Sequence, residues 1–174
     1  MTELKLIESA KRGKMRAFKK LYELNVAQLY SFMKQFSSDI DEVEEWVQRA
    51  FIKAFNRLNQ FKGNSKFSTW LFRIAINEMK TDYLKYGKIT FLNLDELIET
   101  QSVEDVKGFE TINDINLLLL EVDELKRAVF LLVEVEGYSH REAADILEIS
   151  EAFSRTTLHR TKRILKEKFV DIGI

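Results

Sequence analysis

Apolar residues recur at intervals of three and four along most of the chain, a spacing that places them on one face of a helix. The clearest example has eight members, which are Val43, Trp46, Val47, Ala50, Phe51, Ala54, Phe55 and Leu58. Ser38–Glu42 supplies capping residues followed by acids, which is typical of a helix start. No run of alternating β-branched residues is long enough for a sheet. The pattern therefore predicts an all-α fold.

The other apolar segments predict two groups of helices. In the first group, residues 1–87, we expect a helix from about Thr2 to Lys11, a longer one after Gly13, the helix described above, and one from about Ser68 that Gly87 ends. Residues 88–116 have weak periodicity and an acidic character, so they predict a linker. The second group follows at residues 117–174.

This second group, residues 117–174, contains a helix–turn–helix pattern. Ser139 and Glu142 form a capping box that opens a short helix. A turn follows, in which Ile149 is expected to be buried, and then comes a final helix. A short helix, a tight turn and a cationic second helix are typical of proteins that place the second helix in the major groove of DNA.

The charges are segregated along the chain. The sum is close to neutral, with 27 basic and 28 acidic residues and a net charge of −1, which excludes a globally basic DNA-binding protein. However, the stretch Arg155–Lys168 carries six cations against Glu167 alone, and the stretch Ile89–Asn116 carries seven acids against Lys107 alone. A neutral sum thus conceals a basic final helix and an acidic middle.

Composition excludes several classes of protein. The chain has no cysteine, so it has no disulfide and no thiolate metal site, and its two histidines, His140 and His159, cannot form a zinc site alone. No membrane span or signal peptide is predicted, which fits a cytoplasmic protein. No set of residues suggests catalysis, so we expect neither an enzyme nor a cofactor, a metal or a small-molecule substrate.

A short polar loop, Lys62–Lys66, is followed by aromatic and cationic residues. Aromatic rings beside cations are what a protein needs to stack on bases and hold the backbone of single-stranded nucleic acid. Packing in the bundle is the favoured alternative for Trp70, and ordinary surface charge is an equal alternative for the cations. Core packing is expected for Phe55, whereas Phe51 fits a core or a contact role equally.

Several runs of residues together resemble the extracytoplasmic-function (ECF) sigma factors, small subunits of bacterial transcription initiation. Glu45–Phe51 and Phe67–Ala75 resemble region 2 of that family. Four further runs resemble region 4 of the family, namely Val129–Leu132, Glu136–Ser139, Glu142–Leu147 and Leu158–Arg160. Two sets of motifs in the right order are far more specific than either alone, since many regulators share a helix–turn–helix.

The resemblance implies a region 2 bundle at residues 1–87, which binds core RNA polymerase and melts promoter DNA, and a region 4 domain at residues 117–174. It implies that core polymerase is bound by Asp41, Glu45, Gln48 and Phe51. The residues that it implies contact the downstream promoter element are Lys62, Asn64, Ser65, Lys66, Phe67, Trp70, Arg73, Asn77 and Lys80. The residues that it implies contact the upstream element are Arg141, Arg155, Thr156, His159, Arg160, Lys162 and Arg163. The implied partners are core polymerase, promoter DNA and an anti-sigma factor.

Three residues depart from the family pattern. Arg49 stands where an acid is usual, and Thr157 stands where a cation is usual. Glu148 replaces a glycine in the turn, where a left-handed backbone costs other residues about 1–2 kcal/mol. These departures favour one alternative, a helical interaction module that has lost its DNA function. The other alternative is a helix–turn–helix regulator that acts without polymerase, which leaves the aromatic and basic loop unexplained.

Overall fold

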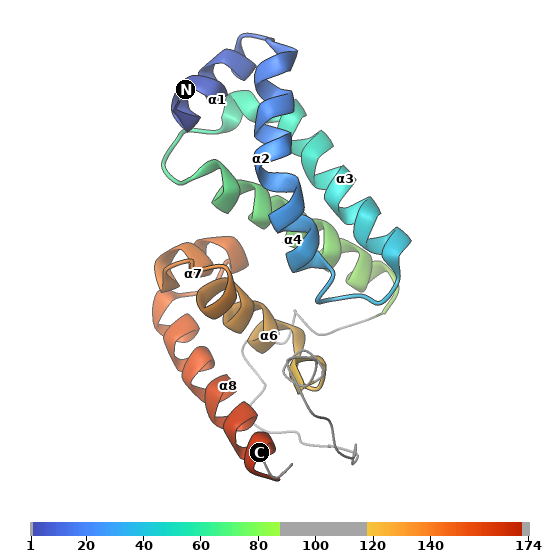
Figure 1. Ribbon diagram of the computed structural model, residues 1–174, viewed down its shortest axis with the longest axis vertical. Helices are drawn as coiled ribbons and strands as arrows, with labels where there is room; N and C mark the ends of the chain where they lie inside the picture. Colours follow the sequence, from blue (N-terminus) through green and yellow to red (C-terminus); the bar gives the residue numbers. More distant parts are fainter. Residues whose placement is uncertain (1, 88–117, 172–174) are drawn as a thin grey trace. The chain divides into compact units, whose positions relative to one another are not determined.

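The computed structural model describes residues 2–87 and 118–171 (Figure 1). Its helices are α1 (Glu3–Lys11), α2 (Met15–Met33), α3 (Ile40–Asn56), the 3₁₀ turn η1 (Leu58–Gln60), α4 (Phe67–Lys85), α6 (Glu124–Phe130), the π-helical turn η2 (Leu131–Val135), α7 (His140–Leu147) and α8 (Glu151–Asp171). Neither described range contains a strand, so the prediction of an all-α fold is confirmed. The acidic linker predicted at residues 88–116 lies outside the described residues.

The chain divides into two compact units between Asp82 and Tyr83. In the first unit, the buried faces of α2, α3 and α4 meet around large side chains. Fully buried members of this core include Leu21, Leu29, Phe32, Trp46, Phe67, Leu71 and Phe72. The rings of Phe32 on α2 and Phe72 on α4 lie 5.1 Å apart and join these two helices. Burial of such large apolar side chains supplies most of the stability of the unit.

Helix α3 begins where the sequence predicts. The side chain of Asp39 caps it by accepting hydrogen bonds from the backbone N–H groups of Asp41, at 3.0 Å, and Glu42, at 3.4 Å. These contacts satisfy donors that have no partner inside the helix. The Glu42 carboxylate in turn accepts a hydrogen bond from the Ser37 hydroxyl at 2.6 Å, which fixes the chain entering the helix.

The prediction that Phe55 packs in the core is wrong. Its side chain is 43% exposed and lies edge-on against the ring of Phe18 on α2, with the ring centres 4.8 Å apart. Phe55 occupies the edge of the apolar stripe of α3, while Ala50 and Ala54 are fully buried. Periodicity identified the apolar face of this helix but did not show where the contact with α2 ends.

In the second unit, α6, α7 and α8 pack around Val129, Leu132, Ile146 and Leu147, all buried. The predicted capping box is present at the start of α7, because the side chains of Ser139 and Glu142 each accept a hydrogen bond from the backbone N–H of the other residue. The π-helical turn η2 was not predicted, and it places a 2.9 Å hydrogen bond from the N–H of Glu136 to the carbonyl of Leu131.

The turn between α7 and α8 has a left-handed residue at its centre. Glu148 lies at φ 60° and ψ 43°, the conformation that glycine adopts most easily. Ile149, expected to be buried in this turn, is half-buried.

A buried arginine, Arg127, holds the helical turn that begins at residue 118. The guanidinium of Arg127 donates hydrogen bonds to the carbonyl oxygens of Leu119, Leu120 and Val122 at 2.7–3.0 Å. Burial lowers the pKa of Arg127, and the negative charge of Glu124 opposes that effect. These hydrogen bonds satisfy carbonyl groups at the end of the helical turn that begins at residue 118.

Candidate functional site

An open groove of about 820 Å³ runs between α2 and α3. It is lined by Met15, Phe18, Tyr22, Val26, Tyr30, Asp41, Glu44, Glu45, Val47, Gln48, Phe51, Ile52 and Phe55. The four residues predicted to bind polymerase are all in this lining, at spacings of four, three and three along α3. The structure therefore brings Asp41, Glu45, Gln48 and Phe51 together on one surface.

The floor of this groove is apolar and its acids lie toward the start of α3. Phe51 is 5% exposed and packs its ring on Tyr22 at 4.6 Å, so it contributes to the floor and to the core at once. Ile52, by contrast, is 53% exposed, and Gln48 is also exposed. Apolar surface that stays open and is bordered by polar groups is typical of a site that binds another protein.

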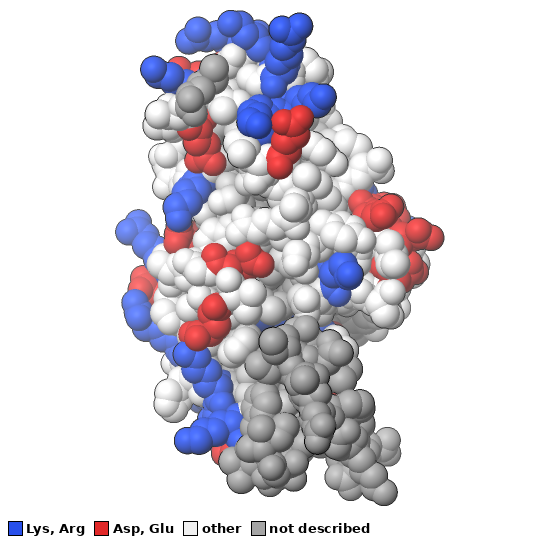
Figure 2. Space-filling model, viewed as in Figure 1, with Lys and Arg blue, Asp and Glu red and all other residues white. Residues whose placement is uncertain are grey.

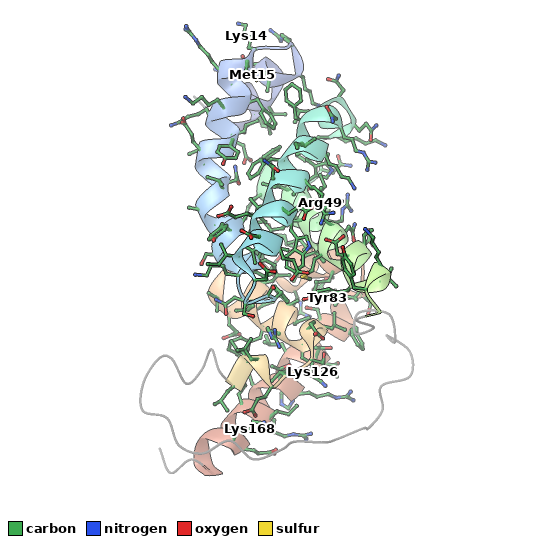
Figure 3. The ribbon with its side chains drawn as sticks, turned by 90° about the vertical axis from the view of Figure 1, so that its right-hand side faces the viewer. Lys14, Met15, Arg49, Tyr83, Lys126 and Lys168 are labelled. Carbon is green, nitrogen blue, oxygen red and sulfur yellow. The ribbon has the colours of Figure 1, made fainter. Side chains whose placement is uncertain are left out.

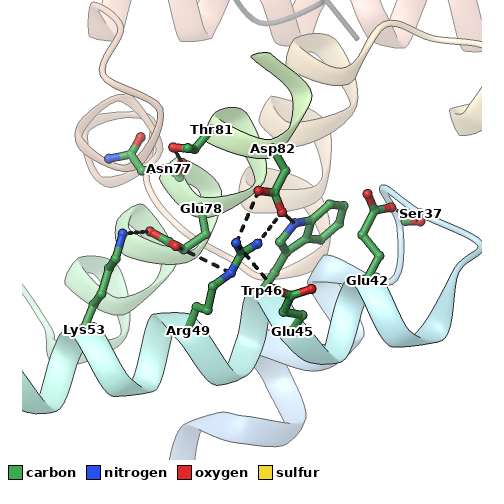
Figure 4. Close-up of polar contacts among 10 residues, drawn as sticks. All are labelled: Ser37, Glu42, Glu45, Trp46, Arg49, Lys53, Asn77, Glu78, Thr81 and Asp82. Atoms are coloured by element: carbon green, nitrogen blue, oxygen red, sulfur yellow. Dashed lines mark hydrogen bonds and ion pairs between the residues drawn. The ribbon is translucent and has the colours of Figure 1, made fainter. Parts of the chain in front are cut away.

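The face of α3 that points away from the groove carries Arg49, which reaches across to α4 (Figure 4). Arg49 forms an ion pair with Asp82 and lies 3.7 Å from carboxylate oxygens of Glu78 and Glu45. The indole N–H of Trp46 donates to the same Asp82 carboxylate at 2.8 Å. The hydrogen bond to Asp82 is the main reason that the pKa of Arg49 is raised, while burial opposes it.

A second ion pair joins Lys53 on α3 to Glu78 on α4. Arg49 and Lys53 are four residues apart on α3, and Glu78 and Asp82 are four residues apart on α4. The two ion pairs therefore lie about one helical turn from each other. Sequence reasoning missed Glu78 and Asp82 as partners of Arg49. The i, i+4 spacing of cations on one helix and acids on another was the available signal.

The loop predicted to hold DNA lies on the surface of the first unit. Lys62, Asn64 and Lys66 are exposed and Ser65 is half-buried. The rings of Phe61, Phe67 and Trp70 anchor both ends of this loop, with centres 5.2–6.1 Å apart.

These three rings are not equally accessible. Phe67 is fully buried, so its ring supports the loop from inside the bundle. Trp70 is half-buried and keeps part of its surface open. Of the two aromatic residues proposed to contact DNA, Trp70 is therefore the one that the structure leaves accessible to a base.

The predicted contacts beyond the loop form a stripe on α4. Trp70, Arg73, Asn77 and Lys80 follow one another at spacings of three, four and three, which places them on one face, and all four are half-buried. The side-chain amide of Asn77 has no hydrogen-bond partner among the residues that the structure describes. This stripe combines a ring, cations and an amide, which together can hold a base and its phosphate.

The outward face of α8 carries most of the predicted upstream contacts. Exposed members are Arg155, Thr156, His159, Arg160, Lys162 and Arg163 on α8, with Arg141 on α7. Figure 2 shows Lys and Arg side chains following this helix. Arg155 pairs with Glu151 at 2.5 Å, and Lys162 pairs with Glu134 at 2.7 Å on the flank of the helix. The two helices are joined by a 2.9 Å hydrogen bond between His140 and Ser154.

Thr157, where a cation is usual, does not face outward. It is 5% exposed, and its backbone carbonyl accepts a hydrogen bond from the Thr161 hydroxyl at 2.8 Å. The absence of a cation at this position therefore leaves the outward face of α8 intact.

Comparison with known proteins decides between the candidate functions. The family model Sigma-70 region 2 matches residues 21–89, and the model Sigma-70, region 4 matches residues 112–165. The chain is 31% identical to the ECF RNA polymerase sigma-E factor of Escherichia coli (strain K12), over 97% of this chain and 94% of that protein. The chain belongs to the ECF sigma factors. It is also 29% identical to the ECF RNA polymerase sigma factor SigW of Bacillus subtilis (strain 168), over 97% of each chain.

Two solved structures are similar to this sigma factor in fold. One is CnrH in complex with the cytosolic domain of CnrY, with a TM-score of 0.71, 22% identity and coverage of 99% of both chains. The other is the sigma factor RpoE in complex with the anti-sigma factor NepR from Bartonella quintana. It has a TM-score of 0.70 and 24% identity, and the match covers 90% of this chain and 98% of that one.

Family membership confirms the predicted function. The sigma factor is a transcription initiation factor that directs bacterial RNA polymerase to promoters, and it is not an enzyme. The alternatives of a regulator without polymerase and of a module without DNA function are not supported. Within the described ranges, no helix combines the length and apolar character needed to cross a membrane.

Proposed function

We propose that this sigma factor divides its work among three surfaces. The groove between α2 and α3 binds core polymerase, the loop at residues 62–66 with the stripe on α4 captures the melted downstream element, and α8 reads the upstream element. The observation that carries this proposal is the common lining of one groove by Asp41, Glu45, Gln48 and Phe51. Three of them, Glu45, Gln48 and Phe51, also belong to the run Glu45–Phe51 that resembles region 2 of the family.

The chemistry of the groove indicates what part of polymerase it binds. An apolar floor with exposed Ile52 and Phe55 suits the apolar face of a helix. The acids Asp41, Glu44 and Glu45 at one end suit basic side chains next to that face. A helix with an apolar stripe bordered by Lys or Arg therefore fits this groove.

The loop and stripe act on single-stranded DNA. Extruding one base from the duplex costs a few kcal/mol. Stacking of a base on an aromatic ring contributes about 1–3 kcal/mol, and phosphate contacts add to it. Trp70 supplies the accessible ring, Asn77 supplies an amide for the edge of a base, and Arg73 and Lys80 hold the backbone. Phe67 keeps the loop in place from within the core.

Helix α8 enters the major groove with its first turns. Arg155 and Thr156 lie near the start of the helix and contact base edges, with His159 beside them. Arg160, Lys162 and Arg163 lie farther along and contact phosphates. The exposed ion pair of Arg155 with Glu151 opens at little cost, because such surface pairs contribute about 0–1 kcal/mol.

An anti-sigma factor is a further proposed partner. The neighbouring solved structures are complexes of a sigma factor with an anti-sigma factor, or of CnrH with the cytosolic domain of CnrY. A protein that covers the apolar groove excludes polymerase from it. Since core polymerase works in the bacterial cytoplasm, this is also where we propose that the sigma factor acts.

Transcription in vitro tests this function. Purified sigma factor and bacterial core polymerase are combined with a library of genomic promoter fragments, and the chain alone is tested on the same fragments by gel shift. We expect specific transcripts only when both proteins are present. Sequence-specific shifts by the chain alone, without any transcript from the mixture, would instead support a regulator that acts without polymerase.

A further inference from the structure

A strongly basic turn joins α1 and α2, and the proposed function does not use it. We call residues 11–20 the basic turn. They contain Lys11, Arg12, Lys14, Arg16, Lys19 and Lys20, and no acid. Figure 2 shows Lys and Arg side chains gathered at one end of the first unit, and Figure 3 labels Lys14 at the end of the bundle where α1 meets α2. In a chain of net charge −1, this concentration of positive charge is local.

Neighbouring acids neutralise only part of this charge. Arg12 lies 4.0 Å from Glu8, while Lys19 and Lys20 share the single carboxylate of Glu23 at 3.9 and 3.6 Å. All of these groups are exposed, so the pairs are weak and screened by salt. Lys14 and Arg16 are exposed and have no ion-pair partner within residues 2–87 and 118–171.

The basic turn is fixed next to the DNA loop. The ammonium group of Lys11 donates a hydrogen bond of 2.5 Å to the carbonyl oxygen of Phe61 and lies 5.9 Å from the centre of its ring. Phe61 directly precedes the loop at residues 62–66 and packs on Trp70 at 5.2 Å. The contact of Lys11 with Phe61 thus ties one end of the basic turn to the residue before this loop, which carries the exposed cations Lys62 and Lys66.

We infer that the basic turn is a second nucleic-acid surface, which binds the phosphate backbone of the promoter next to the melted element. The turn offers cations without an exposed aromatic platform, since Phe18 packs against Phe55 in the groove. Such a surface holds phosphates but does not read bases. This inference rests on the proposed function of the loop, because the loop determines which DNA lies beside the turn.

The salt dependence of promoter binding tests this inference. Holoenzyme is assembled from core polymerase and either the natural chain, Arg16→Gln, or the double variant Lys14→Gln with Arg16→Gln. Promoter occupancy is then measured over a range of salt concentrations. Each lost phosphate contact should reduce the slope of log K against log salt by about 0.9 for duplex or about 0.7 for single-stranded DNA. The size of the change thus identifies which form of DNA the turn holds.

Lys34→Gln is the matched control. Lys34 is exposed at the other end of α2, roughly 27–30 Å from Arg16 and Lys14 by the rise of the helix, and its replacement removes the same charge as Arg16→Gln. Its slope should equal that of the natural chain. Selected promoter sequences should be unchanged in all variants, because phosphate contacts carry no sequence information.

Three other results overturn the inference. The first is an unchanged salt slope in the double variant. The second is a salt slope that falls as much in Lys34→Gln as in Arg16→Gln. The third is a loss of affinity for core polymerase in the absence of DNA, which means that the basic turn binds an acidic protein surface instead.

A variant of the loop, Lys66→Ala, is measured alongside the variants of the basic turn. If it impairs promoter opening while the basic turn variants change nothing, the inference fails and the proposed function stands. If only the basic turn variants have an effect, the proposed role of the loop fails.

Discussion

Arg49 on α3 forms an ion pair with Asp82 on α4, and Trp46 donates its indole N–H to the same carboxylate. The Asp82 carboxylate thus contacts two side chains of the neighbouring helix α3. Because α3 carries the proposed polymerase contacts and α4 carries the proposed DNA contacts, this carboxylate fixes the two surfaces relative to each other. The acid that is usual at position 49 would lie near the carboxylates of Asp82 and Glu78 and would be repelled by them, whereas Arg49 pairs with them.

Arg49→Ala should reduce the free energy of unfolding of the sigma factor by about 2–3 kcal/mol, measured by urea denaturation. Removing one member of a fully buried pair costs about 3–5 kcal/mol, and the 30% exposure of the Arg49 side chain lowers this value. Arg49→Glu should cost more, because it adds repulsion. The raised pKa of Arg49 means that its contribution is complete at neutral pH and is lost only as strongly alkaline pH deprotonates it.

Gln48→Ala is the control for these variants, since Gln48 is exposed on the same helix and should change stability by less than about 0.5 kcal/mol. A double-mutant cycle between Arg49→Ala and Asp82→Ala should give a coupling energy of about 1–3 kcal/mol. Strictly additive effects would show that the two side chains do not interact in solution.

Gln48→Ala and Ile52→Ala should weaken binding to core polymerase, measured by fluorescence anisotropy with labelled sigma factor. Contact residues at the centre of an interface lose about 2 kcal/mol on truncation, which is roughly 30-fold in Kd. Phe51→Ala should also weaken binding. Because the ring of Phe51 packs on Tyr22, the free energy of unfolding of this variant must be measured in parallel.

Leu24→Ala provides the matched control for the groove. Leu24 is exposed on α2 but does not line the groove, so its removal should leave the affinity unchanged. If Leu24→Ala weakens binding as much as Ile52→Ala does, the polymerase contact lies on a different face of the bundle.

Glu148→Gly should stabilise the protein by about 1 kcal/mol in thermal or urea unfolding. The residue sits at φ 60°, where a side chain is strained and glycine is not. Asp145→Gly is the contrasting variant, because Asp145 is exposed within α7, where glycine should destabilise the helix by about 0.3 kcal/mol relative to aspartate. Destabilisation by both variants would mean that the left-handed turn does not persist in solution.

Arg155→Ala should cost about 1–3 kcal/mol in upstream-element binding and relax the preference at one base pair, as shown by selection from randomised upstream sequences. Arg163→Ala should weaken all sequences alike and reduce the salt slope by about 0.9, because it removes a phosphate contact. Thr157→Ala should leave the selected motif unchanged, since Thr157 is buried. If Arg163→Ala alters the motif and Arg155→Ala does not, the assignment of α8 residues to bases and phosphates is reversed.

Local signals in the sequence predicted the helices and their starts well. The caps at Asp39 and Ser139 are side-chain contacts with nearby backbone, and short-range spacing reveals them. The partners of Arg49 lie 29 and 33 residues away, at Glu78 and Asp82, and pairing at that distance depends on how α3 and α4 pack.

The limits of periodicity are also visible within the candidate site. Phe55 and Phe67 both continue apolar stripes, yet one is exposed in the groove and the other is fully buried beneath the loop. Spacing identifies the face of a helix, but the neighbouring helix determines how far that face is covered. The π-helical turn η2 was missed for a related reason, because it depends on a single extra residue within a helical run.

Permanganate reactivity of unpaired thymines in promoter DNA tests the central claim, that the first unit opens the promoter, most directly. Holoenzyme carrying the natural loop is compared with holoenzyme in which Asn64, Ser65 and Lys66 are all replaced by alanine. The division of work proposed above predicts that the variant still forms the closed complex, through α8 and the polymerase groove, but gives much weaker thymine reactivity. Equal loss of the closed and open complexes, or undiminished reactivity, would contradict it.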